Sequence, residues 1–452
     1  MKIALVARHA TPPTRIYDPY SADQAAHVSG LGRALAAQGH DVVIYARKDS
    51  EKLPSRLSIA PRLTAEFITA GPQAPVPPDQ LPQYAREIAS YLAARWRKNT
   101  PDVVHAYHWT SALAALSAAR EVPVPIVATF GSLGAAERRH GIAGECSAVR
   151  LRLESCIAKT ATSVLATTSD EINELSRLGV QNGTVAYVPT GVDTTIFKPT
   201  GYSAKRTKHP RLLTVGPLTE YRGLDLLLRC LPELPGAELV IAGGPPADEL
   251  ESDHGYRILA KLAAHLGITE RVHFTGHVDD RELPSLLRSA DLLVSAARYE
   301  PLGSIAIRAM ACGLPVVATE IGSYRDAVID GTSGLLVPAE RPAALARQLH
   351  DLLATPMRMA AFGIAAADRA RSRYSWDRVA AETAAVYERA ISKGPSVQLT
   401  LAAVPAAGKP RQAGSLRAVT SRTTVRPVQH RTGSRQSSRN QPLLVPVGGH
   451  AA

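Results

Sequence analysis

Short apolar runs of strand length alternate with amphipathic stretches of helix length over almost the whole chain. Strands that follow one another in this way are joined by right-handed crossovers, which produce parallel sheets covered by helices. A polar stretch at 191–210 separates two series of such runs. The first series is 2–8, 41–46, 102–107, 125–130, 163–168 and 184–189, and the second is 211–216, 237–244, 271–276, 291–296, 315–319 and 333–338. We therefore predict an α/β protein with two tandem, Rossmann-like, doubly wound domains that face a cleft.

The length of 452 residues suits two domains of ordinary size with additional segments. The changes in composition place a first domain at 1–195 and a second at 205–372. Residues 394–452 are rich in Ser, Thr, Arg, Gln, Pro and Gly and have no apolar periodicity, so we predict a disordered tail there. Helices are predicted at 23–38, 83–98 and 145–160 in the first domain, and at 223–231, 255–266, 280–289, 303–312, 340–354 and 357–372 in the second.

The net charge of +12 is distributed unevenly. Eight Lys and Arg residues and no Asp or Glu lie in 394–452, which leaves +4 for the rest of the chain. The folded part is thus only mildly basic, and we expect no nucleic-acid partner for it. For the basic tail two interpretations stay open, a solvated segment without a partner and a segment in weak contact with an anionic membrane surface or nucleic acid.

The N-terminal stretch MKIALVARH has a six-residue apolar core, which is shorter than the apolar region of a signal peptide. No apolar run approaches the ~20 residues of a membrane span. The four cysteines have no CxxC or metal-ligand spacing, as is typical of small core residues in a reducing compartment. We expect a cytoplasmic protein.

Three loops that follow strands in the second domain carry residues suited to a phosphorylated sugar. Ligands in open α/β sheets bind beyond the carboxyl ends of the strands. The loop at 215–223 offers Arg222, the loop at 241–246 brings two glycines to a strand end, and Glu300 precedes a helix that starts near Gly303. Free N–H groups at that helix start would bind a phosphate, and Glu300 could accept hydrogen bonds from sugar hydroxyls. Taken singly, each loop is better explained as a structural turn.

The order and spacing of these loops resemble those of the family 4 glycosyltransferases, which have the GT-B fold. The resemblance covers residues 2 to about 390. It rests on ALAAQGHDVVIYAR, PDVVHAYHW, VPIVATFGSLG, VLATTSDEINELSRLGV, VPTGVDTTIFKP, AELVIAGGPP, RVHFTGHVDDRELPSLLRSADLLVSA, YEPLGSIAIRAMACGLPVVAT and DGTSGLLVP.

The resemblance implies a retaining glycosyltransferase that uses a nucleotide-diphosphate sugar as donor and needs no metal or other cofactor. The acceptor, of unknown identity, would bind the first domain, and a last helix at 373–392 would cross back to that domain. The implied catalytic residues are Glu300, Arg222 and His108. The implied donor-binding residues are Gly216, Gly243, Gly244, Leu302, Gly303, Ser304 and Arg308, and the acceptor-side residues are His105, Tyr107, Gly131 and Ser132.

The chain departs from the family pattern in the second domain. The family has two glutamates separated by seven residues, one near the donor sugar and one on the ribose. Glu300 keeps the first position, and Arg308 occupies the second. The first residue of the family's basic pair is Pro217, and Arg222 replaces the usual lysine of that pair. The carboxylate that would accept the ribose hydroxyls is therefore missing from this helix.

Further departures lie in the first domain. The glycine pair that approaches the donor phosphate in the family falls at Ala22 and Asp23. Asp23 would repel a diphosphate unless it caps the following helix. Gly131 replaces a histidine, and the second histidine of a His-x-His pattern is displaced to His108.

Two functional hypotheses follow from the family pattern and its departures. The first is an active retaining glycosyltransferase with altered donor or acceptor handling. The alternative is a pseudo-glycosyltransferase that binds a partner, a nucleotide or a glycan without turnover. A pairing of Arg308 with Glu300 in the cleft would count against ordinary sugar binding. Local structural roles compete at other positions: His105 and His108 could be satisfied strand-end histidines, and the stretch with Arg150, Arg152 and Glu154 is interpreted as a solvated helix face.

Overall fold

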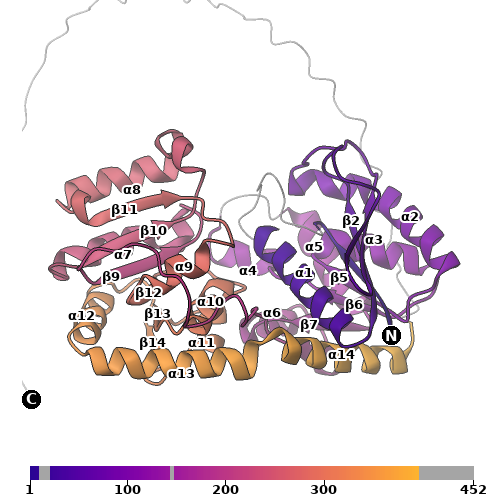
Figure 1. The fold of residues 1–452 in the computed structure, drawn as a ribbon. Helices are drawn as coiled ribbons and strands as arrows, with labels where there is room; N and C mark the ends of the chain where they lie inside the picture. Colours follow the sequence, from indigo (N-terminus) through magenta and orange to yellow (C-terminus); the bar gives the residue numbers. More distant parts are fainter. Residues whose placement is uncertain (10–20, 143–146, 396–452) are drawn as a thin grey trace, which may run out of the picture. The chain divides into compact units, whose positions relative to one another are not determined.

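The computed structural model describes residues 1–9, 21–142 and 147–395. The chain divides into one unit at Met1–Val404 and a second at Pro405–Ala452, which lies outside the described residues, as does nearly all of the predicted tail. The first unit contains two α/β lobes, each built on its own sheet (Figure 1). The predicted architecture of two Rossmann-like domains is confirmed.

The first lobe is built on a sheet of eight strands in the order β3-β4-β2-β1-β5-β6-β7-β8. All neighbours pair in parallel except β3 and β4, which form an antiparallel hairpin at one edge. The strands are β1 (Lys2–Ala7), β2 (Asp41–Arg47), β3 (Arg56–Ala60), β4 (Leu63–Ile68), β5 (Val103–Tyr107), β6 (Ile126–Thr129), β7 (Ser163–Ala166) and β8 (Val185–Tyr187). The sequence analysis missed β3 and β4.

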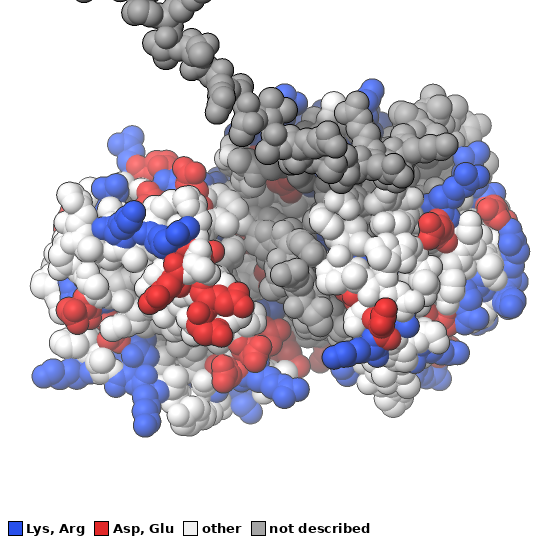
Figure 2. Space-filling view, turned by 90° about the horizontal axis from the view of Figure 1, so that it is seen from above, with Lys and Arg blue, Asp and Glu red and all other residues white. Residues whose placement is uncertain are grey.

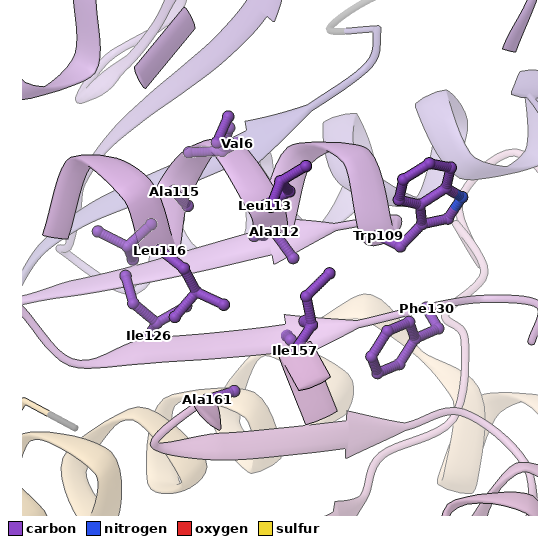
Figure 3. Packing of buried hydrophobic residues seen from close by; sticks show 14 of the residues in the cluster. Val6, Trp109, Ala112, Leu113, Ala115, Leu116, Ile126, Phe130, Ile157 and Ala161 are labelled. Atoms are coloured by element: carbon purple, nitrogen blue, oxygen red, sulfur yellow. The ribbon is translucent and has the colours of Figure 1, made fainter. Parts of the chain in front are cut away.

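Helices cover both faces of this sheet, and each face has its own apolar core. The helices are α1 (Ser21–Ala37), α2 (Ala85–Lys98), α3 (Trp109–Ala119), α4 (Gly134–Arg139), α5 (Ala148–Thr160) and α6 (Ser169–Arg177). In one core, Leu116 of α3 lies beside Ile126 of β6, with Ile157 of α5 close by (Figure 3). Helix α3 is buried almost all round, so it has no polar stripe to reveal it in the sequence.

The second lobe is built on six parallel strands in the order β11-β10-β9-β12-β13-β14. The strands are β9 (Arg211–Val215), β10 (Glu238–Ala242), β11 (Val272–Gly276), β12 (Leu292–Ser295), β13 (Val316–Thr319) and β14 (Gly334–Val337). The helices are α7 (Leu224–Cys230), α8 (His254–His265), α9 (Leu283–Arg288), α10 (Ser304–Ala311), α11 (Gly322–Ala327), α12 (Pro342–Leu353) and α13 (Pro356–Tyr374). The strand order reverses at β9, and this reversal is where such sheets bind ligands.

Helix α14 (Trp376–Lys393) follows α13 but packs on the first lobe beside α1 (Figure 1). Val379 and Tyr387 are buried in the core of that lobe. The Trp376 indole lies flat against two glycines of the first half of the chain: a Cβ built on Gly30 or Gly191 would lie 2.4 Å from the ring. The first lobe therefore comprises the β1–β8 sheet with α1–α6 and α14.

Within the described residues, no helix has both the length and the apolar composition to cross a membrane. Blue and red side chains are interspersed over the face in Figure 2.

Candidate functional site

The candidate site of the second lobe lies at the carboxyl ends of β9, β10 and β12. The loops after β9 and β10 touch through their backbones, because the N–H of Gly216 donates to the carbonyl of Ala242 at 2.9 Å. A Cβ on Gly243 would lie 2.1 Å from the carbonyl oxygen of Gly216, and Gly243 has a φ of 126°. Only glycine fits this close approach, whether or not a ligand binds there. Gly244, with a φ of 88°, continues the same turn.

Arg222 and Glu300, two of the predicted catalytic residues, form a buried ion pair. Their side chains are 7% and 5% exposed. Arg222 also donates to the carbonyl of Val215 at 2.8 Å, and its guanidinium lies where a side chain on Gly216 would have to be. The hydroxyl of Tyr324 lies 3.5 Å from the Glu300 carboxylate. The two catalytic candidates are therefore held rigidly against each other at the strand ends.

The second oxygen of Glu300 fixes the start of α10. It accepts hydrogen bonds from the N–H groups of Leu302 and Gly303 at 3.2 and 3.1 Å. Gly303 has a φ of 64°, and a Cβ there would lie 2.4 Å from the Ser323 hydroxyl oxygen. This close contact explains why glycine precedes the helix, which begins at Ser304. The predicted donor-binding stretch 302–304 is thus shaped by Glu300 itself.

Arg308 does not pair with Glu300. Its guanidinium lies 3.1 Å from a carboxylate oxygen of Asp280 and 3.6 Å from one of Asp23, and it stacks over the Phe197 ring at 5.5 Å. The side chain is only 16% exposed. Arg308 therefore faces neither the solvent nor Glu300, and the pairing that would count against ordinary sugar binding is absent between these two residues.

Asp23 belongs to the first turn of α1 in the first lobe and reaches the second lobe. Its Oδ1 accepts a hydrogen bond from the Ser304 hydroxyl at 2.8 Å. Because α1 begins at Ser21, Asp23 lies inside the helix and is not its cap. Burial raises the pKa of Asp23, Glu300 raises it further, and Arg308 and the Ser304 hydrogen bond oppose these effects. The carboxylate thus lies at the N-terminus of α10, where the sequence predicted a phosphate.

His105 and Tyr107 lie in the core of the first lobe and do not reach the cleft. His105 is 0% exposed and hydrogen-bonds to the hydroxyls of Tyr387 and Thr129 at 2.7 and 2.9 Å. Tyr107 is 1% exposed and stacks on His105, with ring centroids 4.1 Å apart. Alternate residues of a strand point to one face, and α14 covers this face of β5. Burial lowers the pKa of His105 well below its usual value, so the ring is neutral.

His108 lies at the N-cap position of α3 with a φ of 72°. Its Nδ1 lies 2.9 Å from the hydroxyl of Thr110. Burial lowers the pKa of His108 well below its usual value, and the nearby cations Arg8 and Arg150 lower it further. The positive φ, which is uncommon for a residue other than glycine, turns the chain sharply at the carboxyl end of β5. The catalytic role of His108 stays a prediction.

Gly131 and Ser132 face the second lobe from the carboxyl end of β6. A Cβ on Gly131, which has a φ of 72°, would contact Gln24 at 3.7 Å and Leu302 at 3.8 Å. The Ser132 hydroxyl lies 3.2 Å from the Tyr299 hydroxyl. Both residues line a cavity of about 310 Å³ between the lobes, here called the interlobe cavity, which Tyr299 and Glu300 also line.

The sequence analysis missed the polar contacts that join the lobes along this cavity. Asp326 of α11 accepts from the N–H and the hydroxyl of Ser169, at the start of α6, both at 2.7 Å. In return, Asp170 of α6 accepts from the N–H of Gly322 at the start of α11, at 2.9 Å. Each aspartate thus accepts from the first N–H of a helix in the other lobe, in addition to the N-cap that Thr168 supplies to α6. The acidic helix start at 169–171 was the only available signal.

Arg150 was predicted to belong to a solvated helix face, and the structure contradicts this. It bridges Glu137 and Glu154, both at 2.7 Å, and its side chain is 14% exposed. Glu154 is 1% exposed and also accepts from the N–H of Gly134. The cluster fixes the 131–134 loop, which carries Ser132.

Comparisons with known proteins cover most of both lobes. The model of the family described as Glycosyltransferase Family 4 matches residues 24–196, and the model described as Glycosyl transferases group 1 matches residues 201–369. D-inositol 3-phosphate glycosyltransferase 2 of Catenulispora acidiphila is 33% identical over 86% of this chain and 95% of its own length. The D-inositol 3-phosphate glycosyltransferase of Streptomyces bingchenggensis is 31% identical over 86% and 90%.

Solved structures with the same fold include sucrose-phosphate synthase from Thermosynechococcus elongatus, at 25% identity and a TM-score of 0.77, covering 87% of this chain and all of that one. Anabaena Alr3699/HepE in complex with UDP and glucose is similar at 18% identity and a TM-score of 0.65, covering 86% and 99%. The second likeness shows the fold alone. Together with the curated relatives, these matches show that the chain belongs to the family 4 glycosyltransferases and has the GT-B fold.

Proposed function

We propose that this glycosyltransferase transfers a sugar from a nucleotide-diphosphate sugar to a hydroxyl of its acceptor, with retention of configuration and without a metal. The observation that carries the proposal is the buried Arg222–Glu300 pair beside the start of α10. It places a cation, a carboxylate and a helix N-terminus within one loop cluster. Relatives of more than 30% identity are named glycosyltransferases, and similar folds bind UDP or UDP-glucose.

In this proposal the positive charge of the site stabilises the departing diphosphate. Arg222 is held on Glu300 and Val215, so it needs little reorganisation when negative charge develops on the leaving group. The N-terminus of α10 adds its dipole to the same region. Glu300 would orient the donor sugar through its hydroxyls. These groups take the part that a divalent cation plays at other diphosphate sites.

The acceptor would bind in the interlobe cavity, beside Glu300 and Ser132. Its volume of about 310 Å³ suits a small polyol or one sugar ring. The curated relatives are named for D-inositol 3-phosphate, which is therefore the first acceptor to test. Arg139 lines the cavity and could face an acceptor phosphate, although Glu174 already binds it at 2.7 Å.

A panel of UDP-, GDP- and ADP-sugars, each with D-inositol 3-phosphate, inositol and simple sugars, tests the proposal. We expect transfer from one donor class, a product that retains the donor's anomeric configuration by NMR, and rates insensitive to EDTA. Glu300→Gln should lower kcat by about 10³-fold or more, because an interaction at the reacting centre is lost. Glu320→Gln is the matched control, since Glu320 is 55% exposed.

Absence of transfer and of donor hydrolysis across the whole panel, with no rise of Tm on adding any nucleotide, would overturn the proposal. That outcome would favour the alternative, a pseudo-glycosyltransferase that acts as a scaffold. An inverted product or full inhibition by EDTA would overturn the retaining or the metal-independent part alone.

A further inference from the structure

Asp23 brings a carboxylate from the first lobe into the donor region of the second. Its Oδ1 accepts from the Ser304 hydroxyl at 2.8 Å and lies 3.6 Å from the Arg308 guanidinium. Ser304 is the first residue of α10, a helix of eight residues, so the carboxylate faces the positive end of that helix. The hydroxyl, the dipole and the guanidinium are the kinds of group that bind a phosphate.

Asp23 and Asp280 together neutralise Arg308. Asp280, on the second lobe and 60% exposed, holds one guanidinium nitrogen at 3.1 Å, while Asp23 lies nearer the other. A carboxylate and a phosphate oxygen accept the same hydrogen bonds, so both cannot occupy the Ser304 position at once. A diphosphate bound at Ser304 would also be repelled by the negative charge of Asp23, which hydrogen-bonds to the same hydroxyl.

We propose that Asp23 is an internal competitor of the donor. Before the donor binds, the Asp23 carboxylate occupies the position of a donor phosphate at Ser304. When the donor enters, the Arg308 guanidinium exchanges Asp23 for the diphosphate as its ion-pair partner. This inference rests on the proposed function. It makes Asp23 a determinant of donor affinity and Arg308 a phosphate ligand.

The two residues then have opposite effects on affinity. Removing the Asp23 carboxylate frees Ser304 and leaves Arg308 with Asp280 as its carboxylate partner in the second lobe. Removing the Arg308 guanidinium takes away a ligand of the donor and a partner of Asp23 together. The two substitutions are therefore expected to be non-additive.

Isothermal titration of the full-length wild type, Asp23→Gly and Asp23→Asn with inorganic pyrophosphate and with UDP tests the proposal. We expect both variants to lower Kd by about ten-fold or more, because a competing charge is gone. Asp279→Asn is the matched control: it removes a neighbouring carboxylate that is 76% exposed and lies 3.5 Å from His277, so its Kd should stay within about two-fold of the wild type. Circular dichroism shows whether each variant is folded, and Asp23→Asn keeps the side-chain size.

Arg308→Gln completes a double-mutant cycle. In the Asp23→Gly protein it should weaken pyrophosphate binding by about ten-fold or more, whereas in the wild type the change should be much smaller. An unchanged or higher Kd in both Asp23 variants, or equal effects of Arg308→Gln in the two backgrounds, would overturn the inference.

The donor panel separates this inference from the proposed function. Transfer by the wild type together with an unchanged Kd in Asp23→Gly would keep the proposed function and reject the internal competitor. A lower Kd for pyrophosphate in both Asp23 variants, without transfer from any donor, would keep the competitor and reject the transfer reaction.

Discussion

Two arginine–carboxylate pairs flank the start of α10, and they differ in where their partners come from. Arg222 and Glu300 both belong to the second lobe and are 7% and 5% exposed. Arg308 and Asp23 belong to different lobes and are 16% and 31% exposed. The first pair is in place whenever the second lobe is folded, whereas the second pair also requires the lobes to be in contact. A pair shielded from water is a fixed element of the site, whereas a pair between lobes can exchange its partner.

The largest effect is expected from breaking the pair within the second lobe. Glu300→Gln leaves the buried Arg222 cation without its carboxylate, which should cost about 3–5 kcal/mol of unfolding free energy. The double variant Arg222→Met/Glu300→Leu should recover most of this loss and remain inactive, because an apolar pair needs no charge compensation. Urea denaturation of the three proteins measures the difference. A Glu300→Gln protein as stable as the wild type would show that water reaches this pair.

The contact between α6 and α11 is expected to be of intermediate strength. Asp326→Ala removes the two hydrogen bonds from Ser169, while the N-cap Thr168 of α6 stays in place. A typical hydrogen bond contributes about 1 kcal/mol of net stability. Urea denaturation should show a decrease of this size, and hydrogen exchange at the Ser169 amide should become faster. Asp368→Ala, at a residue that is 68% exposed, is the control and should change neither quantity.

The sequence placed Arg222 and Glu300 at one site without predicting that they pair, and it did not place Asp23 against Ser304 and Arg308. Arg222 and Glu300 each follow a buried strand, and parallel strands bring their carboxyl ends to one edge of the sheet. Nothing local links Asp23 to Ser304, which is 281 residues away in the chain, so their contact depends on how the lobes meet. From the sequence, Asp23 could be identified only as an unexpected acidic residue near the predicted donor phosphate.

The difference between local patterns and contacts of distant segments also explains the other wrong or missed predictions. The family resemblance implied that His105 and Tyr107 lie on the acceptor side, but alternation along a strand does not say which face a later helix will cover. That helix is α14, and Tyr387 reaches His105 across 282 residues. Strand β3 was missed because Arg56–Ala60 is a largely exposed edge strand. Strand β4 is buried, but Thr64 and the charged Glu66 interrupt its apolar run.

The smallest expected effect is the pH dependence that Asp23 confers on the free energy of unfolding. It is also the most direct measure of the difference between the two arginine–carboxylate pairs. Burial and Glu300 raise the pKa of Asp23 above the ordinary value of 3.8, so ionising it costs the folded protein free energy. The cost of ionising Asp23 lowers the free energy of unfolding as the pH rises from about 3.8 through the raised pKa. Below pH 3.8 the carboxyl is protonated in both states, and the cost is absent. Asp23→Asn should therefore be at least as stable as the wild type at pH 7, by up to ~1 kcal/mol, since about a third of the side chain stays in solvent.

Denaturant unfolding between pH 4.5 and 7.5 measures this difference, which should shrink as the pH falls because both proteins then carry a neutral group at position 23. Asp279→Asn serves as the control, since Asp279 is 76% exposed. If Asp23→Asn were instead less stable than the wild type at pH 7, the attraction of Arg308 would outweigh the cost of burial. The pair between the lobes would then stabilise the fold as the Arg222–Glu300 pair does, and Asp23 would leave Ser304 less readily for a donor.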